Sequence, residues 1–309
     1  MTRRHLLPLA AVAACNRRNK RVIGVVPKAT SHLFFMAVHA GVKQAAAEFG
    51  FDIDWNGPQD ETDHARQIQV VDAMVAQKVN ALAISATDEN TLSQAVQRAI
   101  DAGIPVSVFD SGVNARGYLT FVATDNLAAG VTAAERLAGL VKEKGKVGMV
   151  MHKPGGTSTM LREQGFEATM KRYPGLTIAA RQYGMADRAK ARAAAENMLT
   201  AHPDMAGLFA SSEASSLGAM QAIESRGLSG KVKLITFDTS DSHIASLKAG
   251  TIDLMLVQDS HRMGYEVVKS LAVKLQGGTP PTRLDLPVQI IARADLMRPE
   301  VQALLSPPH

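Results

Sequence analysis

PVSVFD, residues 105 to 110, and KLITFD, residues 233 to 238, are two apolar runs that each end in Phe-Asp. Short, uninterrupted apolar runs are typical of strands that are buried on both faces of a sheet. Each of these two runs closes a similar series of apolar runs in its own half of the chain. The matching ends therefore predict an internal repeat, in which Asp110 and Asp238 occupy equivalent positions.

Apolar runs alternate with longer segments of helical periodicity in both halves. In the first half we expect strands at 22–26, 51–55, 81–85 and 105–110, with helices around 34–49, 62–77 and 90–102. In the second half we expect strands at 146–151, 176–181, 207–211 and 233–238, with helices around 160–172, 187–201 and 214–226. This alternation indicates an α/β fold of two lobes, each with a parallel sheet that helices cover on both faces.

Candidate binding residues follow the predicted strands, because ligands bind beyond the carboxyl ends of an open parallel sheet. Phe34 and Phe35 come just after the first strand, and neighbouring helix positions are about 100° apart, so both rings cannot easily pack inward. One or both should face a crevice, where an aromatic face suits the C–H face of a sugar ring. The alternative is that both rings fill the seam between helix and sheet.

Asp110 and Asp238 leave several roles open. A carboxylate at a strand end can bind hydroxyls, act as an acid or base, ligate a metal, or cap the next helix. Their matched positions favour a shared role in a cleft between the lobes.

The composition describes a globular protein of two domains, with 46% hydrophobic and 20% charged residues in 309. Six basic residues and no acidic residue lie in residues 1–21, so the net charge of +5 becomes −1 without them. The rest of the chain lacks the basic character of a nucleic-acid-binding protein.

The N-terminus is typical of an export signal, with basic TRRH before apolar LLPLAAVAA. This apolar run is too short to span a bilayer. VAAC, residues 12 to 15, resembles the lipobox of bacterial lipoproteins. The resemblance implies a signal peptide at 1–14 and a lipid-anchored tether at 15–21, with the lipid on Cys15. The alternative is an incidental cysteine in a cytosolic chain.

Other chemistry finds little support in the sequence. There is no GxxxxGK[ST], GxGxxG, HExxH or GxSxG, and the nine histidines lack metal-ligand spacing. We therefore expect no catalytic residue, no metal and no cofactor. His32, at the mouth of the predicted site, is the histidine of interest.

Seven short motifs stand in an order that resembles the periplasmic sugar-binding proteins of the ribose type, the solute receptors of ABC importers. The motifs are SHLFF (31–35), FDSG (109–112), ATDN (123–126), LREQGF (161–166), LGAMQAI (217–223), FDTSD (237–241) and LVQDSHRMG (256–264). The resemblance covers about residues 21–295.

This resemblance implies the type I periplasmic binding protein fold, in which two Rossmann-like lobes hinge shut around a ligand. Three crossing strands would join the lobes near 124–126, 255–259 and 284–288. The N-terminal lobe would comprise 22–124 plus 259–286, and the C-terminal lobe 125–258 plus 287–303.

The resemblance also implies roles for single residues. It implies stacking by Phe34 and Phe35, and hydroxyl binding by Asp110, Arg162, Asp238 and Gln258. Four positions depart from ribose receptors, which have asparagine at His32, arginine at Ser111, asparagine at Ser212 and an aromatic residue near Ala186. We therefore expect a roomier site with fewer charged donors, suited to a sugar other than ribose or to a polyol.

Together these features predict an extracytoplasmic, lipid-anchored monomer that delivers a monosaccharide or polyol to an ABC permease without covalent chemistry. A sugar sensor that presents its closed form to a membrane kinase or chemoreceptor would have the same binding residues. A sugar-responsive transcription regulator would need a helix-turn-helix where residues 1–21 stand. An α/β enzyme would need a nucleophile and base that the sequence does not offer.

Overall fold

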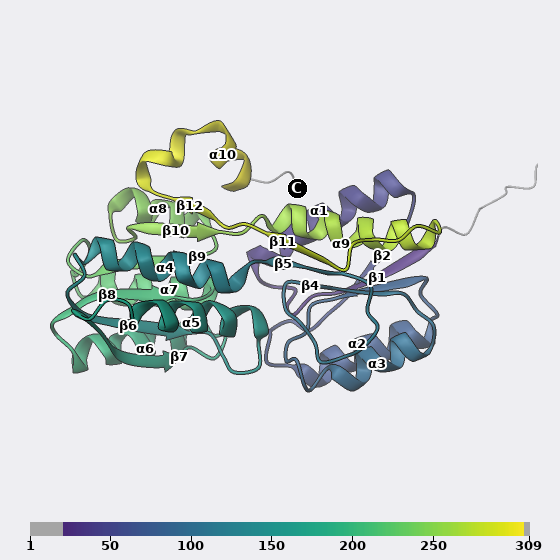
Figure 1. The fold of residues 1–309 in the computed structure, drawn as a ribbon, viewed down its shortest axis with the longest axis horizontal. Helices are drawn as coiled ribbons and strands as arrows, with labels where there is room; N and C mark the ends of the chain where they lie inside the picture. The colour runs from purple at the N-terminus through teal and green to yellow at the C-terminus, as the bar shows by residue number, and fades with distance from the viewer. Residues whose placement is uncertain (1–20, 306–309) are drawn as a thin grey trace, which may run out of the picture.

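The structure is a computed structural model that describes residues 21–305. The predicted signal peptide and the lipid site at Cys15 lie outside the described residues. Two α/β lobes lie side by side, each built on a six-stranded sheet (Figure 1). No helix within 21–305 is long and apolar enough to cross a membrane.

The first sheet takes its strands from both ends of the described chain. Its strands and the helices packed on it are β1 Val22–Val26, α1 Leu33–Phe49, β2 Asp52–Trp55, α2 His64–Ala76, β3 Ala81–Ile84, α3 Ser93–Asp101, β4 Val106–Phe109, β5 Phe121–Thr124, α9 Ser260–Leu275 and β11 Arg283–Leu286. The strand order is β11-β5-β4-β3-β1-β2, and every pair is parallel. Helices α1 and α9 cover one face, and α2 and α3 cover the other.

The second sheet repeats this plan. Its elements are α4 Asn126–Leu140, β6 Gly145–Met151, α5 Thr157–Met170, β7 Leu176–Tyr183, α6 Arg188–Ala201, β8 Met205–Ala210, α7 Glu213–Ser225, β9 Lys233–Phe237, α8 Asp241–Ala249, β10 Leu254–Val257, β12 Gln289–Ile291, the 3-10 helix η1 Arg293–Met297 and α10 Pro299–Leu305. The order β12-β10-β9-β8-β6-β7 matches that of the first sheet strand for strand. Asp110 and Asp238 therefore follow the fourth strand of equivalent sheets, as the repeat predicts.

Three short segments carry the chain between the sheets. They lie between β5 and α4, between β10 and α9, and between β11 and β12. Asp125 and Asp259 end two of these crossings, and each caps the next helix by accepting from a backbone amide three residues on. At the third crossing the chain runs straight from one sheet into the other. Strand β12 is consequently antiparallel to β10, whereas the sequence predicts parallel sheets throughout.

Close packing between α4 and α5 sets the position of α5 in the second lobe. Helices α4 and α5 approach so closely that a Cβ atom at Gly130 would lie 2.0 Å from the carbonyl oxygen of Arg162. A Cβ at Gly165 would lie 2.3 Å from the carbonyl oxygen of Leu127. These two glycines let α5 pack directly on α4, and α5 in turn carries Arg162 toward the other lobe.

Candidate ligand-binding site

A small cavity of about 30 Å³ lies between the lobes, at the carboxyl ends of both sheets. The lining residues are Lys28, His32, Phe34, Phe35, Glu61, Asp110, His152, Ser158, Thr159, Arg162, Ser212, Glu213, Ala214, Asp238 and Gln258. Both lobes and the second crossing contribute to it, so the cavity exists only while the lobes are together.

Most residues proposed from sequence come together here. The lining includes His32, Phe34, Phe35, Asp110, Arg162, Ser212, Asp238 and Gln258. Ser111 is fully buried behind the lining, where its Oγ contacts Lys28 and Ser158. Ala186 lies on the loop after β7, outside the lining, and its amide donates to the carbonyl of His152.

The two phenylalanines divide their roles. Phe35 is 1% exposed and belongs to the core between α1 and the first sheet, while Phe34 is half-buried. Their rings meet edge to face, with centroids 5.0 Å apart. Both alternatives therefore hold in part, because Phe35 fills the seam and Phe34 is the ring better placed to meet a ligand.

Asp110 and Asp238 share an unusual backbone. Both are in the left-handed region, with φ of 57° and 68°. Non-glycine residues adopt this region infrequently, and aspartate is among those that tolerate it. The same turn therefore presents a carboxylate from each lobe to one cavity.

Their surroundings differ. Asp110 lies 2.9 Å from Lys28 Nζ and accepts from Ser85 Oγ at 2.8 Å. Asp238 accepts from Gln258 Nε2 at 2.6 Å and from the Glu213 amide at 3.1 Å. Burial raises the pKa of Asp238, although Arg162 and Gln258 oppose the shift.

Arg162 is fully buried and held on three sides. Its Nε donates to Asn126 at 2.7 Å, its Nη1 donates to the carbonyl of Ser211 at 2.9 Å, and its guanidinium lies 3.7 Å above the ring of Phe237. Glu163, the next residue, accepts from the His152 amide and from Ser211, and burial raises its pKa to about 7. These contacts leave Arg162 Nη2 available to a ligand, and they fix the plane of the guanidinium.

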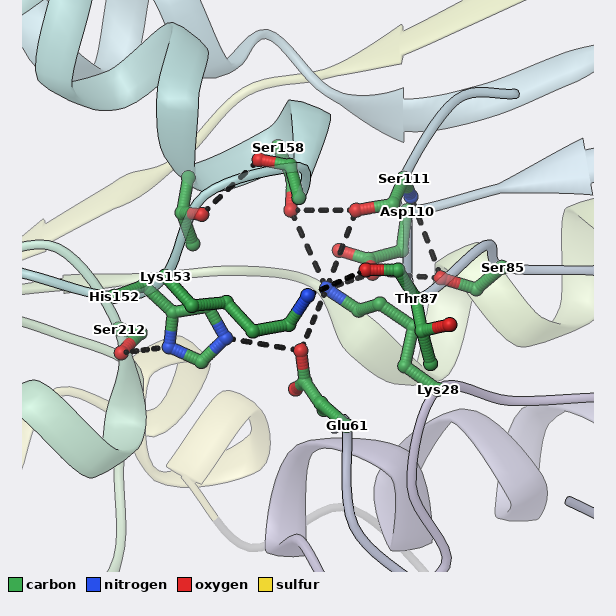
Figure 2. Close-up of polar contacts among 12 residues, drawn as sticks. Lys28, Glu61, Ser85, Thr87, Asp110, Ser111, His152, Lys153, Ser158 and Ser212 are labelled. Carbon is green, nitrogen blue, oxygen red and sulfur yellow. Dashed lines mark hydrogen bonds and ion pairs between the residues drawn. The ribbon is translucent and has the colours of Figure 1, made fainter. Parts of the chain in front are cut away.

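Seven lining residues were not identified from the sequence, and Lys28, Glu61 and His152 are the three of them that form one charged cluster. Figure 2 shows them converging from both lobes, with the ammonium of Lys28 among the oxygens of Asp110, Ser111, Glu61 and Ser158. His152 directly follows β6, Lys28 lies two residues after β1, and Glu61 lies in the loop after β2. The strand-end rule that selected Asp110 could have selected them too.

Glu61 joins the lobes. Its carboxylate lies 2.9 Å from His152 Nε2, 3.3 Å from His32 Nδ1 and 3.4 Å from Lys28 Nζ. Burial alone would raise the pKa of Glu61, but the charge of Lys28 and the His152 contact hold it well below its ordinary value. Burial lowers the pKa of His152, although the charge of Glu61 opposes the shift. Its Nε2 lies 2.9 Å from Glu61 and its Nδ1 lies 2.9 Å from Ser212 Oγ.

These residues correct the expectation of fewer charged donors. Lys28 Nζ lies 3.2 Å from Ser111 Oγ, so a cation from the loop after β1 lies beside the short side chain at position 111. His152 likewise lies beside Ser212. The site is polar, charged and tightly filled rather than roomy.

Further contacts hold the lobes together around the cavity. Ser111 and Ser158 hydroxyls are 2.9 Å apart, Lys153 Nζ donates to the Thr87 carbonyl at 2.6 Å, and the Gly112 amide donates to Thr157 Oγ1 at 2.6 Å. Fold and site thus define a two-lobed protein with a small polar cavity between its lobes. Within the described residues, no group of three His, Cys, Asp or Glu side chains is arranged to hold a metal ion.

Comparisons with known proteins agree with this class. The family model of the periplasmic binding protein domain matches residues 23–279. A D-ribose/D-allose-binding protein of Pseudomonas aeruginosa is 30% identical over 297 residues, which cover 92% of each chain. The ribose import binding protein of Bacillus subtilis is 28% identical, over 89% of each chain.

Solved structures are similar over almost the whole chain. An ABC transporter solute-binding protein of Agrobacterium vitis, bound to α-D-tagatopyranose, has a TM-score of 0.90 and 32% identity, and covers 94% of this chain and 100% of its own. A carbohydrate transporter solute-binding protein of Agrobacterium radiobacter, in complex with D-arabinose, has a TM-score of 0.91 and 32% identity with the same coverage. The chain belongs to the periplasmic binding protein family, among the type I sugar-binding proteins of ABC importers.

Proposed function

We propose that this chain is an extracytoplasmic receptor that captures a monosaccharide or related polyol between its lobes and delivers it to the permease of an ABC importer. The observation that carries this proposal is the closed polar cavity, to which equivalent strand ends of both lobes bring Asp110 and Asp238. A ligand that contacts both carboxylates would favour the closed form over the open one, and a permease can recognise that form.

The site offers each type of contact that a sugar needs. Phe34 presents a ring, Arg162 presents an unused guanidinium nitrogen, and Asp110, Asp238 and Gln258 present oxygens or an amide for hydroxyls. The relatives named above bind aldoses and a ketose, which supports a ligand of the same chemical class.

The remaining parts of the proposal concern the lobes, the location and the assembly. We assign 22–124 plus 259–286 to the N-terminal lobe and 125–258 plus 287–303 to the C-terminal lobe. Residues 1–14 would be removed as a signal peptide, and a lipid on Cys15 would anchor the protein to a bacterial membrane, in the periplasm or at the cell surface. The receptor would act there as a monomer.

A thermal-shift screen of the protein from residue 16 onward tests the function. Pentoses, hexoses, deoxysugars, polyols and several amino acids form the panel. A ligand at 100 times its Kd adds about 2.7 kcal/mol to the free energy of unfolding, so a true ligand gives a clear rise in Tm. The ligand should be recovered unchanged. A flat response across the sugars and polyols would contradict the proposal.

A further inference from the structure

Two short segments from opposite lobes meet beside the cavity, and the lining described above includes neither of them. Residues 87–89 lie in the loop after β3, and residues 153–155 lie in the loop after β6. Lys153 Nζ donates to the carbonyl of Thr87 at 2.6 Å, and the amide of Glu89 donates to the carbonyl of Gly155 at 3.1 Å. Figure 2 shows Lys153 reaching Thr87 from the other lobe. We call these two segments the clasp.

The first half of the clasp is held in place by its own lobe. Gln67 is fully buried, and its Oε1 accepts from the amide of Thr87 at 2.9 Å and from the hydroxyl of Thr87 at 2.8 Å. Asp88 Oδ1 accepts from the amides of Asn90 and Thr91 at 3.0 Å and 2.7 Å. The backbone groups of this half are therefore fixed within the first lobe, and closure brings them their partners from the second.

Lys153 contributes to the clasp from a buried position. The residue is 3% exposed, and its ammonium donates to a backbone carbonyl. Thr87 is also fully buried, so its carbonyl would lose a partner without the lysine, and an unsatisfied buried carbonyl is costly. Burial lowers the pKa of Lys153, because closure takes hydration from the ammonium. These two effects oppose each other, so Gly155 reports on the clasp more directly than Lys153 does.

Gly155 lets the two segments approach closely. Its φ is 84°, and a Cβ atom there would lie 1.8 Å from Asp88 Oδ2 and 2.8 Å from Asp88 Cγ. The carboxylate cannot easily move aside, because its other oxygen accepts from two amides of its own lobe. Since Gly155 and Asp88 belong to different lobes, this clash would exist only while the lobes are together.

We propose that the clasp holds the lobes together without a ligand, so that the unliganded protein is already mostly closed and every ligand gains affinity by the same factor. A ligand that binds the closed form has an apparent Kd equal to its intrinsic Kd divided by the closed fraction. Residues 153–155 act as positioning residues in this scheme. They raise the closed fraction and make no ligand contact, since they lie outside the cavity lining.

Small-angle X-ray scattering of the unliganded protein tests the proposal. Wild type should have nearly the same radius of gyration with and without sugar. Gly155→Ala should have a larger one, which falls to the wild-type value when a sugar saturates the site. The double variant Gly155→Ala/Asp88→Ala should return toward wild type, because the Cβ of residue 88 would lie 3.4 Å from the added methyl group, an ordinary contact.

Two controls separate the clash from other effects. Gly103 has a similar φ of 79°, and a Cβ atom there would meet nothing within 4 Å. Gly103→Ala therefore reproduces the backbone strain of an alanine in the left-handed region without the clash, and it should scatter like wild type. Asp88→Ala alone removes the carboxylate that holds its own loop, and it should also stay closed without sugar.

Calorimetric titration with D-ribose, D-allose, D-arabinose and D-tagatose supplies a second readout. Gly155→Ala should weaken every sugar that binds by one common factor, roughly tenfold. Lys153→Met, which keeps the side-chain length but cannot donate, should weaken them by a smaller common factor. Gly103→Ala should bind as wild type does.

The proposal is overturned if unliganded wild type has the same large radius of gyration as Gly155→Ala, or if Gly155→Ala scatters like wild type. Failure of the double variant to recover would overturn it too, because the effect of the methyl group would then not arise at Asp88. A changed rank order of the sugars would show a ligand contact instead of a clasp. If wild type binds no sugar, the proposed function fails, while the scattering comparison still decides whether the clasp closes the lobes.

Discussion

The two lobes place an aspartate at the same point of the same strand order, but they surround it differently. Asp110 lies 2.9 Å from an ammonium, whereas amides of Gln258 and Glu213 bind Asp238, whose pKa is raised by burial. The backbone turn is the same in both lobes. The repeat therefore sets where each carboxylate lies, and the neighbouring residues set which groups it binds.

Replacing each of the two aspartates with asparagine tests this difference between the lobes, and it should give the largest change in stability. Asparagine tolerates the left-handed backbone, so the change removes charge alone. Removing one partner of a buried ion pair costs about 3–5 kcal/mol. We expect Asp110→Asn to approach that loss, because the carboxylate that remains paired with Lys28 is Glu61, at the longer distance of 3.4 Å. Asp238→Asn should cost about 1 kcal/mol, because its partners are amides. Urea unfolding at pH 7 measures both, and equal losses would contradict the comparison.

The comparison extends to two buried glutamates. In the second lobe, Glu163 has a pKa of about 7, raised by burial from an ordinary value of 4.5. Because the folded value is the higher one, its favourable contribution is complete below about pH 4.5 and is lost as pH rises through 7. The loss amounts to about 3 kcal/mol. Glu163→Gln should remove this pH-dependent loss of stability, so the variant should be more stable than wild type at pH 8.

Urea unfolding between pH 5 and 9 checks this expectation, with Glu135→Gln as an exposed control on α4. Parallel pH profiles for wild type and Glu163→Gln would show that Glu163 does not titrate in this range. The first lobe should behave in the opposite way. The folded pKa of Glu61 is below its ordinary value, so its contribution is present above about pH 4.5 and is lost as pH falls further.

Ser158→Ala should give the smallest effect. Ser158 Oγ lies 2.9 Å from Ser111 Oγ and 3.5 Å from Lys28 Nζ, across the cleft from both. Asp110 holds Lys28 without it, so the free energy of unfolding should fall by about 1 kcal/mol or less and ligand affinity roughly fivefold or less. Calorimetry with the best sugar from the screen measures the affinity. A loss above 100-fold would show that Ser158 contacts the ligand directly.

The sequence predicts the lobes well because their signal is local. VIGVV gives β1 with the expected ends, and the Phe-Asp pair marks β4 and β9. The predicted series omitted β5 and β10 as sheet strands, because each is a four-residue run directly before a crossing. The antiparallel direction of β12 was also missed, since direction depends on how the chain crosses and not on its apolar pattern.

The site is less predictable because its charges meet over long distances in sequence. Three different loops contribute one residue each, namely Lys28, Glu61 and His152. Only folding brings Glu61 to 3.4 Å from Lys28 and to 2.9 Å from His152. Arg162 and Gln258 were found through motif order, which reports position but not partners. The close packing around Ser111 could not be inferred from that residue alone, because the side chain beside it, Lys28, comes from a distant segment of the sequence.

The passage of β11 and α9 back into the first sheet has a consequence for synthesis of the chain. Met263, Val267 and Leu271 of α9 pack with α1, and Leu286 of β11 closes the same core. These residues are made after every element of the second lobe except β12, η1 and α10. The part of α1 that packs on α9 therefore stays uncovered until α9 has been made, and this core is complete only once residue 286 has been added. The first lobe begins first, but it cannot complete its core until most of the second lobe has been synthesised.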